Sequence, residues 1–362
     1  MLLTLLLAAH IAVSSPGTTP QTQPWVSADA RQAVAVWVEG GQILLSRIAF
    51  DGNLLDTGRI VSPRGVTPRS ASNGTNHLIV WIDHNDVDGR FLSPSGEFIG
   101  DSFGITDGGG AEMVAVTAAG SKYFVAWSGP RPGAALVGVT QSVDRFDVFS
   151  ATDQVVGDIS ATAVDETNAA IAYTNQGTTD KTIMTLSVQA GMAGTTNTIA
   201  AQSAPIDLHT PRIVHDDFGF VVAWTQENGP SFAFVNRLDE NGKPIGDPIM
   251  VGSTSSFPAA TAAPVDARVI SINDSGLIEA RIDFTCSCET QQQTLDAPVT
   301  KIAPSFSNIA AAKLPQGGIA VIYELATREE GEPLNNARPR IFLQFVDLPA
   351  PPPSSRHRPA RH

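Results

Sequence analysis

The chain has 362 residues and a formal net charge of −13, from 36 acidic and 23 basic side chains. This charge disfavours non-specific binding to nucleic acid or to an anionic membrane surface. Charged residues make up only 16% of the chain, whereas glycine and proline number 31 and 25. Such a composition suits many short strands and turns, and it argues against a helical bundle or a coiled coil.

The chain begins with an apolar segment that runs from Leu2 to Val13. It is too short to cross a bilayer as a helix, but its length fits the hydrophobic region of a signal peptide. Ala12-Val13-Ser14 resembles a cleavage site, although no basic residue precedes the segment. A buried N-terminal strand is the alternative. We expect a signal peptide over 1–14, no membrane insertion after its removal, and a secreted or periplasmic protein.

Two segments outside the folded region have distinct compositions. Residues 15–23 form a linker of Ser, Pro, Gly, Thr and Gln, and residues 349–362 are rich in proline and arginine. Proline blocks regular hydrogen bonding, and neither segment has the apolar residues to bury a core. We therefore expect a disordered tail at 349–362 and a single folded region over 24–348.

A short apolar segment that ends in an aromatic residue recurs along this region at spacings of 44 to 52 residues. The residues at this position are Trp37, Trp81, Trp127, Tyr173, Trp224, Ser271 (without an aromatic ring) and Tyr323. In each copy a short strand precedes it, and an alternating strand and a fourth short strand follow. Asp51-Gly52 and Asn241-Gly242 are hairpin turns of these copies.

Four antiparallel strands in about 45 residues, repeated along the chain, are typical of a β-propeller blade. Seven copies predict an all-β fold: a seven-bladed β-propeller of four-stranded antiparallel blades, with the repeated aromatic residues packed between blades. The seventh copy supplies only three good strands before Pro349. We therefore expect the seventh blade to be three-stranded, or to gain at most a weak fourth strand from the N-terminus.

The repeats resemble a group of secreted bacterial β-propeller proteins whose Trp-ended blades read roughly V-x-W, a short turn, D-I-Y-x-x-R and x-x-G. The best match is WIDHNDVDGRFLSPSGEFIG, from Trp81 to Gly100. The resemblance implies the fold and an extracellular or periplasmic setting. Because propellers host many functions, it implies little chemistry.

The sharpest local motif is the acidic turn from Asp83 to Gly89, in which His84, Asp86 and Asp88 imitate the start of a calcium-binding loop. Calcium prefers oxygen ligands, yet the first ligand position is His, and Ser95 stands where the loop needs Glu. An ordinary solvated turn is the favoured interpretation and a calcium site the alternative. We expect no metal and no other cofactor.

Cys286 and Cys288 are the only cysteines of the sequence. In an oxidising compartment we expect them to form a local disulfide, although a single intervening residue makes a strained ring. Free thiols and a soft-metal site are the alternatives. The sequence contains no zinc-protease helix motif, no nucleophile elbow and no P-loop, so the corresponding hydrolase and nucleotide-binding functions have no support.

Propellers present a broad face built from the loops that join the second and third strands of each blade. The chemistry of these loops differs from copy to copy, as a surface for an irregular partner requires. The candidate binding residues are Glu39, Asp83, His84, Asp86, Asp88, Arg131, Asp180, Glu227, Asn228, Arg328 and Glu330. We expect a monomeric, non-enzymatic binding or scaffolding module for a protein or glycan partner, with no catalytic residues.

The alternative function is a carbohydrate-active enzyme, a glycosidase or a lyase, with its site in the central channel. Such a site needs two or more converging acids with a neighbouring His or Arg. The predicted inner strands, such as those in 258–264 and 307–314, instead consist mostly of small and apolar residues. This composition favours the binding module.

Overall fold

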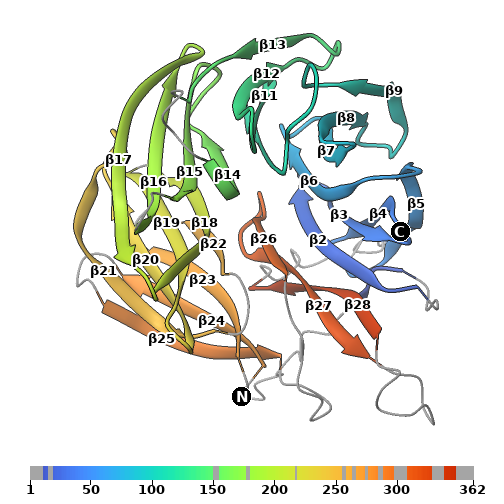
Figure 1. The fold of residues 1–362 in the computed structure, drawn as a ribbon. Helices are drawn as coiled ribbons and strands as arrows, with labels where there is room; N and C mark the ends of the chain where they lie inside the picture. Colours follow the sequence, from blue (N-terminus) through green and yellow to red (C-terminus); the bar gives the residue numbers. More distant parts are fainter. Residues whose placement is uncertain are drawn as a thin grey trace, which may run out of the picture.

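The structure is a computed structural model. It describes residues 11–14, 19–149, 155–176, 180–216, 218–254, 258–262, 266–273, 276–283, 288–296, 308–327 and 338–347. These residues form seven four-stranded antiparallel sheets around a common centre (Figure 1). The predicted seven-bladed β-propeller is thereby confirmed. The described part of the chain contains no helix, and therefore none that could cross a membrane.

Six of the blades follow the chain from the innermost to the outermost strand. Blade 1 contains β2 (Gln21–Ala28), β3 (Gln32–Glu39), β4 (Gln42–Ala49) and β5 (Leu54–Ser62). Blade 2 contains β6 (Val66–Ser72), β7 (His77–Asp83), β8 (Asp86–Leu92) and β9 (Phe98–Gly104). Blade 3 contains β10 (Met113–Ala119), β11 (Lys122–Ser128), β12 (Gly133–Val137) and β13 (Val143–Phe146).

The next three blades keep the same order. Blade 4 contains β14 (Val155–Ala163), β15 (Asn168–Gln176), β16 (Asp180–Gln189) and β17 (Met192–Ser203). Blade 5 contains β18 (Asp207–Asp216), β19 (Gly219–Glu227), β20 (Ser231–Leu238) and β21 (Pro244–Ser253). Blade 6 contains β22 (Ala259–Ala262), β23 (Asp266–Asn273), β24 (Gly276–Asp283) and β25 (Cys288–Asp296).

Blade 7 joins the two ends of the chain. Its inner strands are β26 (Ile309–Lys313), β27 (Ile319–Thr327) and β28 (Arg338–Val346), and its outermost strand is β1 (Ile11–Ala12). The three-stranded alternative is thus wrong for this chain. The fourth strand is short, as expected, because β1 makes only two register pairs with β28.

Hydrophobic cores lie between successive blades, and each repeated aromatic residue lies in a different one. Trp81 of blade 2, for example, packs with Val34 and Val36 of blade 1. The second strand of each blade reads as a nearly continuous apolar run because neighbouring blades cover both of its faces. The outermost strands are more exposed, as the burial of β17 and β21 shows.

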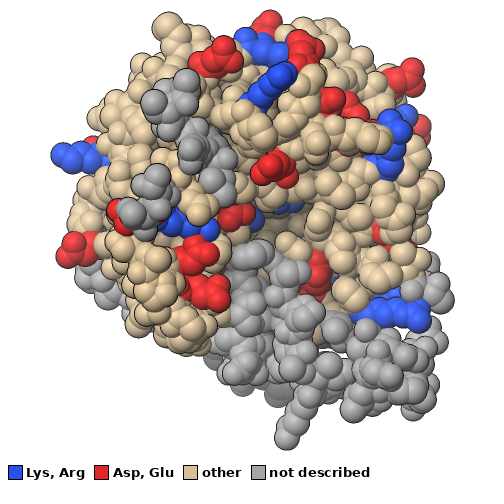
Figure 2. Space-filling model, in the orientation of Figure 1, with Lys and Arg blue, Asp and Glu red and all other residues tan. Residues whose placement is uncertain are grey.

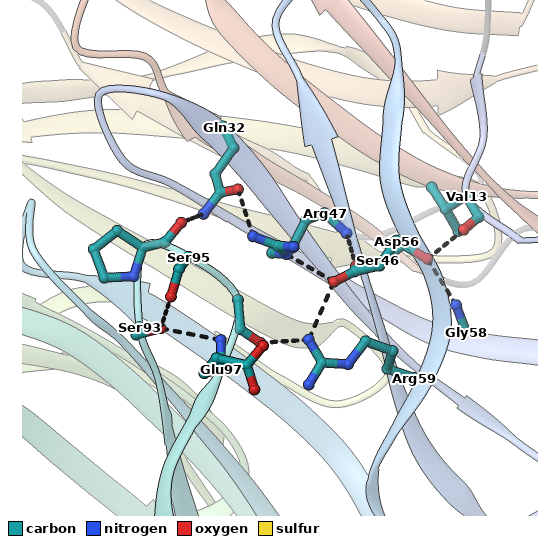
Figure 3. A network of polar contacts seen from close by, with 12 residues as sticks. Val13, Gln32, Ser46, Arg47, Asp56, Gly58, Arg59, Ser93, Ser95 and Glu97 are labelled. Atoms are coloured by element: carbon teal, nitrogen blue, oxygen red, sulfur yellow. Dashed lines mark hydrogen bonds and ion pairs between the residues drawn. The ribbon is translucent and has the colours of Figure 1, made fainter.

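The core between blades 7 and 1 also contains Val13, which is fully buried. Its backbone N–H donates to the Ile341 carbonyl oxygen at 3.2 Å, so the segment after β1 continues along β28. Its carbonyl oxygen accepts a 2.5 Å hydrogen bond from Ser46 Oγ, and Ser46 in turn accepts from the backbone N–H of Gly58 (Figure 3). The N-terminal segment is therefore held by both blades that close the ring.

Blade 1 is tied to blade 2 by polar contacts and by one close approach of the backbone. Arg47 and Arg59 both pair with Asp56, at 2.7 and 3.2 Å, and Arg59 also reaches Gly96 of blade 2 (Figure 3). Gly65 connects the two blades with φ +142°, and a Cβ there would lie 2.6 Å from a ring carbon of Trp81. Only glycine fits this position without displacing the ring.

Candidate functional site

The innermost strands of the seven blades share one equivalent position. It pairs with the residue just before the repeated aromatic position of the second strand, as Trp25 pairs with Val36, which precedes Trp37. Its seven occupants are Trp25, Arg69, Ala115, Ser160, Arg212, Ala259 and Ala310. Four of these side chains are small. The other three are an indole and two guanidinium groups, so the sequence-based expectation of a small, apolar channel holds for only part of the ring.

A cavity of about 150 Å³ lies among these innermost strands. Trp25, Ser160, Arg212, Ala259 and Ala310 all line it, together with neighbouring residues of β10, β14, β18, β22 and β26. Blades that carry alanine or serine at the shared position leave room at the centre of the ring. The cavity is therefore bounded by small side chains, by one indole and by one arginine.

The three large side chains share the same irregular local backbone structure. The innermost strand shifts register at three equivalent segments, which are Gln23-Pro24-Trp25, Thr67-Pro68-Arg69 and Thr210-Pro211-Arg212. Gln23, Thr67 and Thr210 have φ of 56°, 56° and 46°. Proline donates no backbone hydrogen bond, so it suits a position where the ladder is interrupted. The repeated Thr-Pro-Arg is the sequence signal that could have revealed this site.

Each register shift forms a bulge in the innermost strand. The backbone N–H groups of these bulges donate to side chains of neighbouring blades. The N–H of Thr67 donates to Gln23 Oε1 of blade 1 at 2.7 Å, and the N–H of Thr210 donates to Asp158 Oδ2 of blade 4 at 2.9 Å. The N–H of Gln23 donates in turn to Glu324 of blade 7. Each contact fixes a bulge against the preceding blade, which places Asp158 near the channel.

The two arginines gather around one indole, although they belong to blades 2 and 5. The guanidinium carbons of Arg69 and Arg212 lie 4.5 and 5.7 Å from the centre of the Trp25 ring, within the range of a cation–π contact. Trp25 Nε1 donates to the Ser70 carbonyl oxygen at 3.0 Å. This hydrogen bond fixes the orientation of the ring against blade 2.

Neither guanidinium lies within 4.0 Å of a carboxylate in the described part of the chain. Arg69 and Arg212 each donate through Nη1 to the carbonyl oxygen of the proline before them, at 2.9 and 3.1 Å. Burial, followed by the charge of Arg212, lowers the pKa of Arg69 to about 9, and Asp158 opposes this change. Burial also lowers the pKa of Arg212. Both side chains stay positively charged at neutral pH.

The described lining of the cavity contains no Asp, Glu or His. Across the described residues, no group of three or more His, Cys, Asp and Glu side chains could hold a metal ion. The described lining of this cavity therefore lacks the pair of acids on which a glycosidase relies.

Most of the candidate binding residues lie on the loop face, where the second and third strands of each blade are joined. His84 and Asn85, with φ of 50° and 66°, form the two-residue turn between β7 and β8. Asp83 contacts His84 Nδ1 at 2.7 Å and Arg64 Nε at 2.6 Å. The side chain of His84 is 72% exposed, so it is available to a partner.

The two following acids of this turn have opposite electrostatic environments. Asp86 accepts hydrogen bonds from the Gly109 N–H and the Thr106 hydroxyl, at 2.6 and 2.9 Å, and these hold its pKa below the ordinary value. Burial, and then the charges of Asp83 and Asp86, raise the pKa of Asp88. Asp86 therefore orders the connection between blades 2 and 3.

Arg131 and Glu39 also contact neighbouring elements. Arg131 Nη1 donates to the Gly108 carbonyl oxygen at 3.0 Å, on the same connection between blades. Glu39 Oε2 accepts from Trp37 Nε1 at 3.1 Å and from Gln21 Nε2 at 3.0 Å. Both side chains therefore help to hold loops and strands in place.

Polar side chains of blades 4 and 5 meet on this face. Asp207 pairs with Lys181 Nζ at 2.7 Å and with His209 Nε2 at 3.2 Å, while Glu227 lies 3.5 Å from His209. Glu227 and its neighbour Asn228 are exposed. The structure thus brings Glu227 into a mixed-charge cluster that spans two blades.

The remaining candidate residues make no contact with this cluster that the structure describes, or they lie outside the described residues. Asp180 is exposed and accepts a hydrogen bond from Ser203 Oγ at 2.7 Å. Arg328, Glu330 and Cys286 lie outside the described residues. Cys288 begins β25, but its side chain lies outside the described part, so the predicted disulfide stays a prediction.

An Asp–His–Ser arrangement lies between blades 1 and 2. His77 Nε2 is 3.1 Å from Asp29 Oδ2, and His77 Nδ1 is 2.9 Å from Ser27 Oγ, which also donates to Ser70 Oγ. All four side chains are buried, and His77 is 0% exposed. The network therefore joins two blades and is buried away from solvent.

Comparisons with known proteins agree with the fold. No protein-family model and no curated protein matches the sequence. Hydrazine synthase of Kuenenia stuttgartiensis aligns with a TM-score of 0.59 at 10% identity, over 92% of this chain and 98% of that chain. The Dos1 propeller aligns with a TM-score of 0.51 at 11% identity, over 87% and 74%. At these identities the likeness shows the fold alone: the protein is a seven-bladed β-propeller.

Proposed function

We propose that the protein is a secreted or periplasmic, non-enzymatic binding or scaffolding module. It presents the loop face to a protein or glycan partner and acts as a monomer. In this proposal it is similar to the secreted bacterial β-propeller repeat proteins whose blade pattern the sequence resembles. The apolar segment before Val13 supports secretion, because its length is that of a signal peptide.

The observation that carries the proposal is the contrast between fixed loop backbones and exposed loop side chains. Asp86 is half-buried and binds the connection between blades 2 and 3, whereas His84, Glu227 and Asn228 are exposed. A rigid scaffold with chemically varied side chains at its rim is a common basis for recognition. Figure 2 shows acidic and basic side chains scattered over one face of the ring, without a large area of one sign.

The test begins with a screen of the purified chain against a glycan array and a library of secreted proteins. The best partner is then measured against the double variant of His84→Ala and Glu227→Ala. A matched double variant of Glu240→Ala and Lys313→Ala changes exposed residues at the opposite end of the blades. We expect at least tenfold weaker binding for the first variant and unchanged binding for the second.

Two results would overturn the proposal. The first is a partner whose affinity falls only in the variant with Glu240→Ala and Lys313→Ala. The second is cleavage of a glycan by the purified chain, detected as new reducing or unsaturated ends. Cleavage would favour the carbohydrate-active enzyme instead.

A further inference from the structure

The channel holds more buried positive charge than the described residues neutralise. Arg69 is 8% exposed, and Arg212 lines the cavity. Asp158 is the acid whose charge acts on both guanidinium groups, and its Oδ2 already accepts the Thr210 N–H. One carboxylate near two guanidinium groups leaves a net positive charge at the centre of the ring.

The polar contacts of Arg212 are incomplete within the described part of the chain. Arg212 Nε is buried and has no hydrogen-bond partner among the residues that the structure describes. A buried charged donor that makes no hydrogen bond destabilises the fold more than a neutral one, because it has lost its water without compensation. The hydrogen bonds that the Arg69 and Arg212 side chains donate, to their own preceding carbonyl oxygens, would form without any neighbouring blade.

The cavity beside Arg212 has the chemistry of a mixed site. Ala259, Ala260, Ala310 and Ala311 supply apolar surface from two blades. A fully polar anion would lose its hydration against these methyl groups. An anion with a short apolar body would instead bury that body there while its charged end reaches the arginine.

We propose that the central channel binds a small monocarboxylate with a short apolar body. Its carboxylate accepts hydrogen bonds from the guanidinium group of Arg212, which lines the cavity, and Arg69 adds a second positive charge. Trp25, oriented by its hydrogen bond to Ser70, holds both guanidinium groups in place. Charge-assisted hydrogen bonds to carboxylates are among the stronger polar contacts in proteins. This site lies in the channel and does not rest on the proposed role of the loop face.

Isothermal titration of the full chain with butyrate tests the site, with butyramide and inorganic sulfate as comparison ligands. We expect saturable binding of butyrate and at least tenfold weaker binding of both others, because butyramide lacks the charge and sulfate lacks the apolar body. Absence of saturable butyrate binding would overturn the proposal. Equal binding of butyramide or of sulfate would overturn the carboxylate assignment.

Four variants locate the site. Arg69→Met and Arg212→Met should each weaken butyrate binding at least tenfold, whereas Arg64→Met, which changes a side chain that is 65% exposed, should leave it unchanged. Without ligand, Arg212→Met should have an unchanged or higher melting temperature, since it removes a buried unsatisfied donor. Should that variant not fold, Arg212→Lys keeps the charge but lacks the planar guanidinium group and should also bind tenfold more weakly. Native affinity in both Arg69→Met and Arg212→Met, or in Arg212→Lys, would contradict the assignment.

Discussion

His77 Nε2 lies 3.1 Å from Oδ2 of Asp29, although the two residues belong to different blades and are both buried. Asp29 also accepts hydrogen bonds from the backbone N–H groups of Arg31 and Gln32. The carboxylate therefore fixes the turn between β2 and β3 and holds the first strand of one blade against the second strand of the next.

Asp29→Asn should destabilise the protein by about 1–3 kcal/mol, because it weakens a buried hydrogen-bond network. The free energy of unfolding in urea measures the change. Asp144→Asn is the matched control, since Asp144 is 66% exposed and lies 3.6 Å from Lys122. Equal unfolding midpoints for both variants would show that the network contributes little to stability.

The carboxylate of Asp29 also makes the stability of the fold depend on pH. Burial raises the pKa of Asp29, but hydrogen bonds from His77 and from the backbone outweigh it and hold the pKa below its ordinary value. A carboxylate with a lowered folded pKa stabilises the fold above its unfolded pKa of about 3.9, and this stabilisation is lost as the pH falls through the folded value. Unfolding midpoints at pH 3 and pH 6 should therefore differ less in Asp29→Asn than in the native chain. An equal difference in both proteins would contradict this assignment.

Trp127→Ala should cost about 3–5 kcal/mol of stability, as expected for removal of a large core side chain. Trp127 is 8% exposed and lies in the core between blades 2 and 3, and its Nε1 donates to the Arg131 carbonyl oxygen at 2.8 Å. Urea unfolding measures the loss, with Trp127→Phe as the conservative comparison. A change below about 1 kcal/mol, within the range of ordinary surface substitutions, would contradict the role of this residue between the blades.

Much of the fold could be predicted because each blade repeats the same pattern at similar spacings, from 44 to 52 residues. Trp37, Trp81 and Trp224 recur at one position, where neighbouring blades cover both faces of a strand. The channel site could not be predicted in the same way. Arg69 and Arg212 lie far apart in the sequence, and only the closed ring brings them to the same indole.

The loop face was only partly predictable from the sequence, because exposure depends on the partners that each side chain finds. Asp86 is half-buried and binds the connection between blades 2 and 3, and Arg131 contacts the same connection although it is exposed. His84 and Glu227 are exposed as well. Composition places all four in polar turns and does not separate these two roles.

The closing strand leads to a prediction about the N-terminus. A chain that lacks residues 1–10 keeps β1 and Val13, whereas a chain that lacks residues 1–14 loses both. Loss of the Val13 side chain from the core alone should destabilise the shorter chain by about 1.5–3 kcal/mol. Urea unfolding of the two truncated chains measures the difference. Equal midpoints would mean that β1 and Val13 do not hold the ring closed. Because cleavage after Ser14 would remove this strand, N-terminal sequencing of the secreted protein would show which form is produced.

The central claim, that the loop face binds a partner, is tested most directly by hydrogen exchange of the chain with and without the best partner from the screen. The account predicts slower exchange, on binding, of amides at 84–86, 129–132 and 228–230, which belong to the loops between second and third strands. It predicts unchanged exchange at 51–53, 95–96 and 240–242, in the turns at the opposite end of the blades. Protection confined to those opposite turns, or spread equally over both ends, would contradict it.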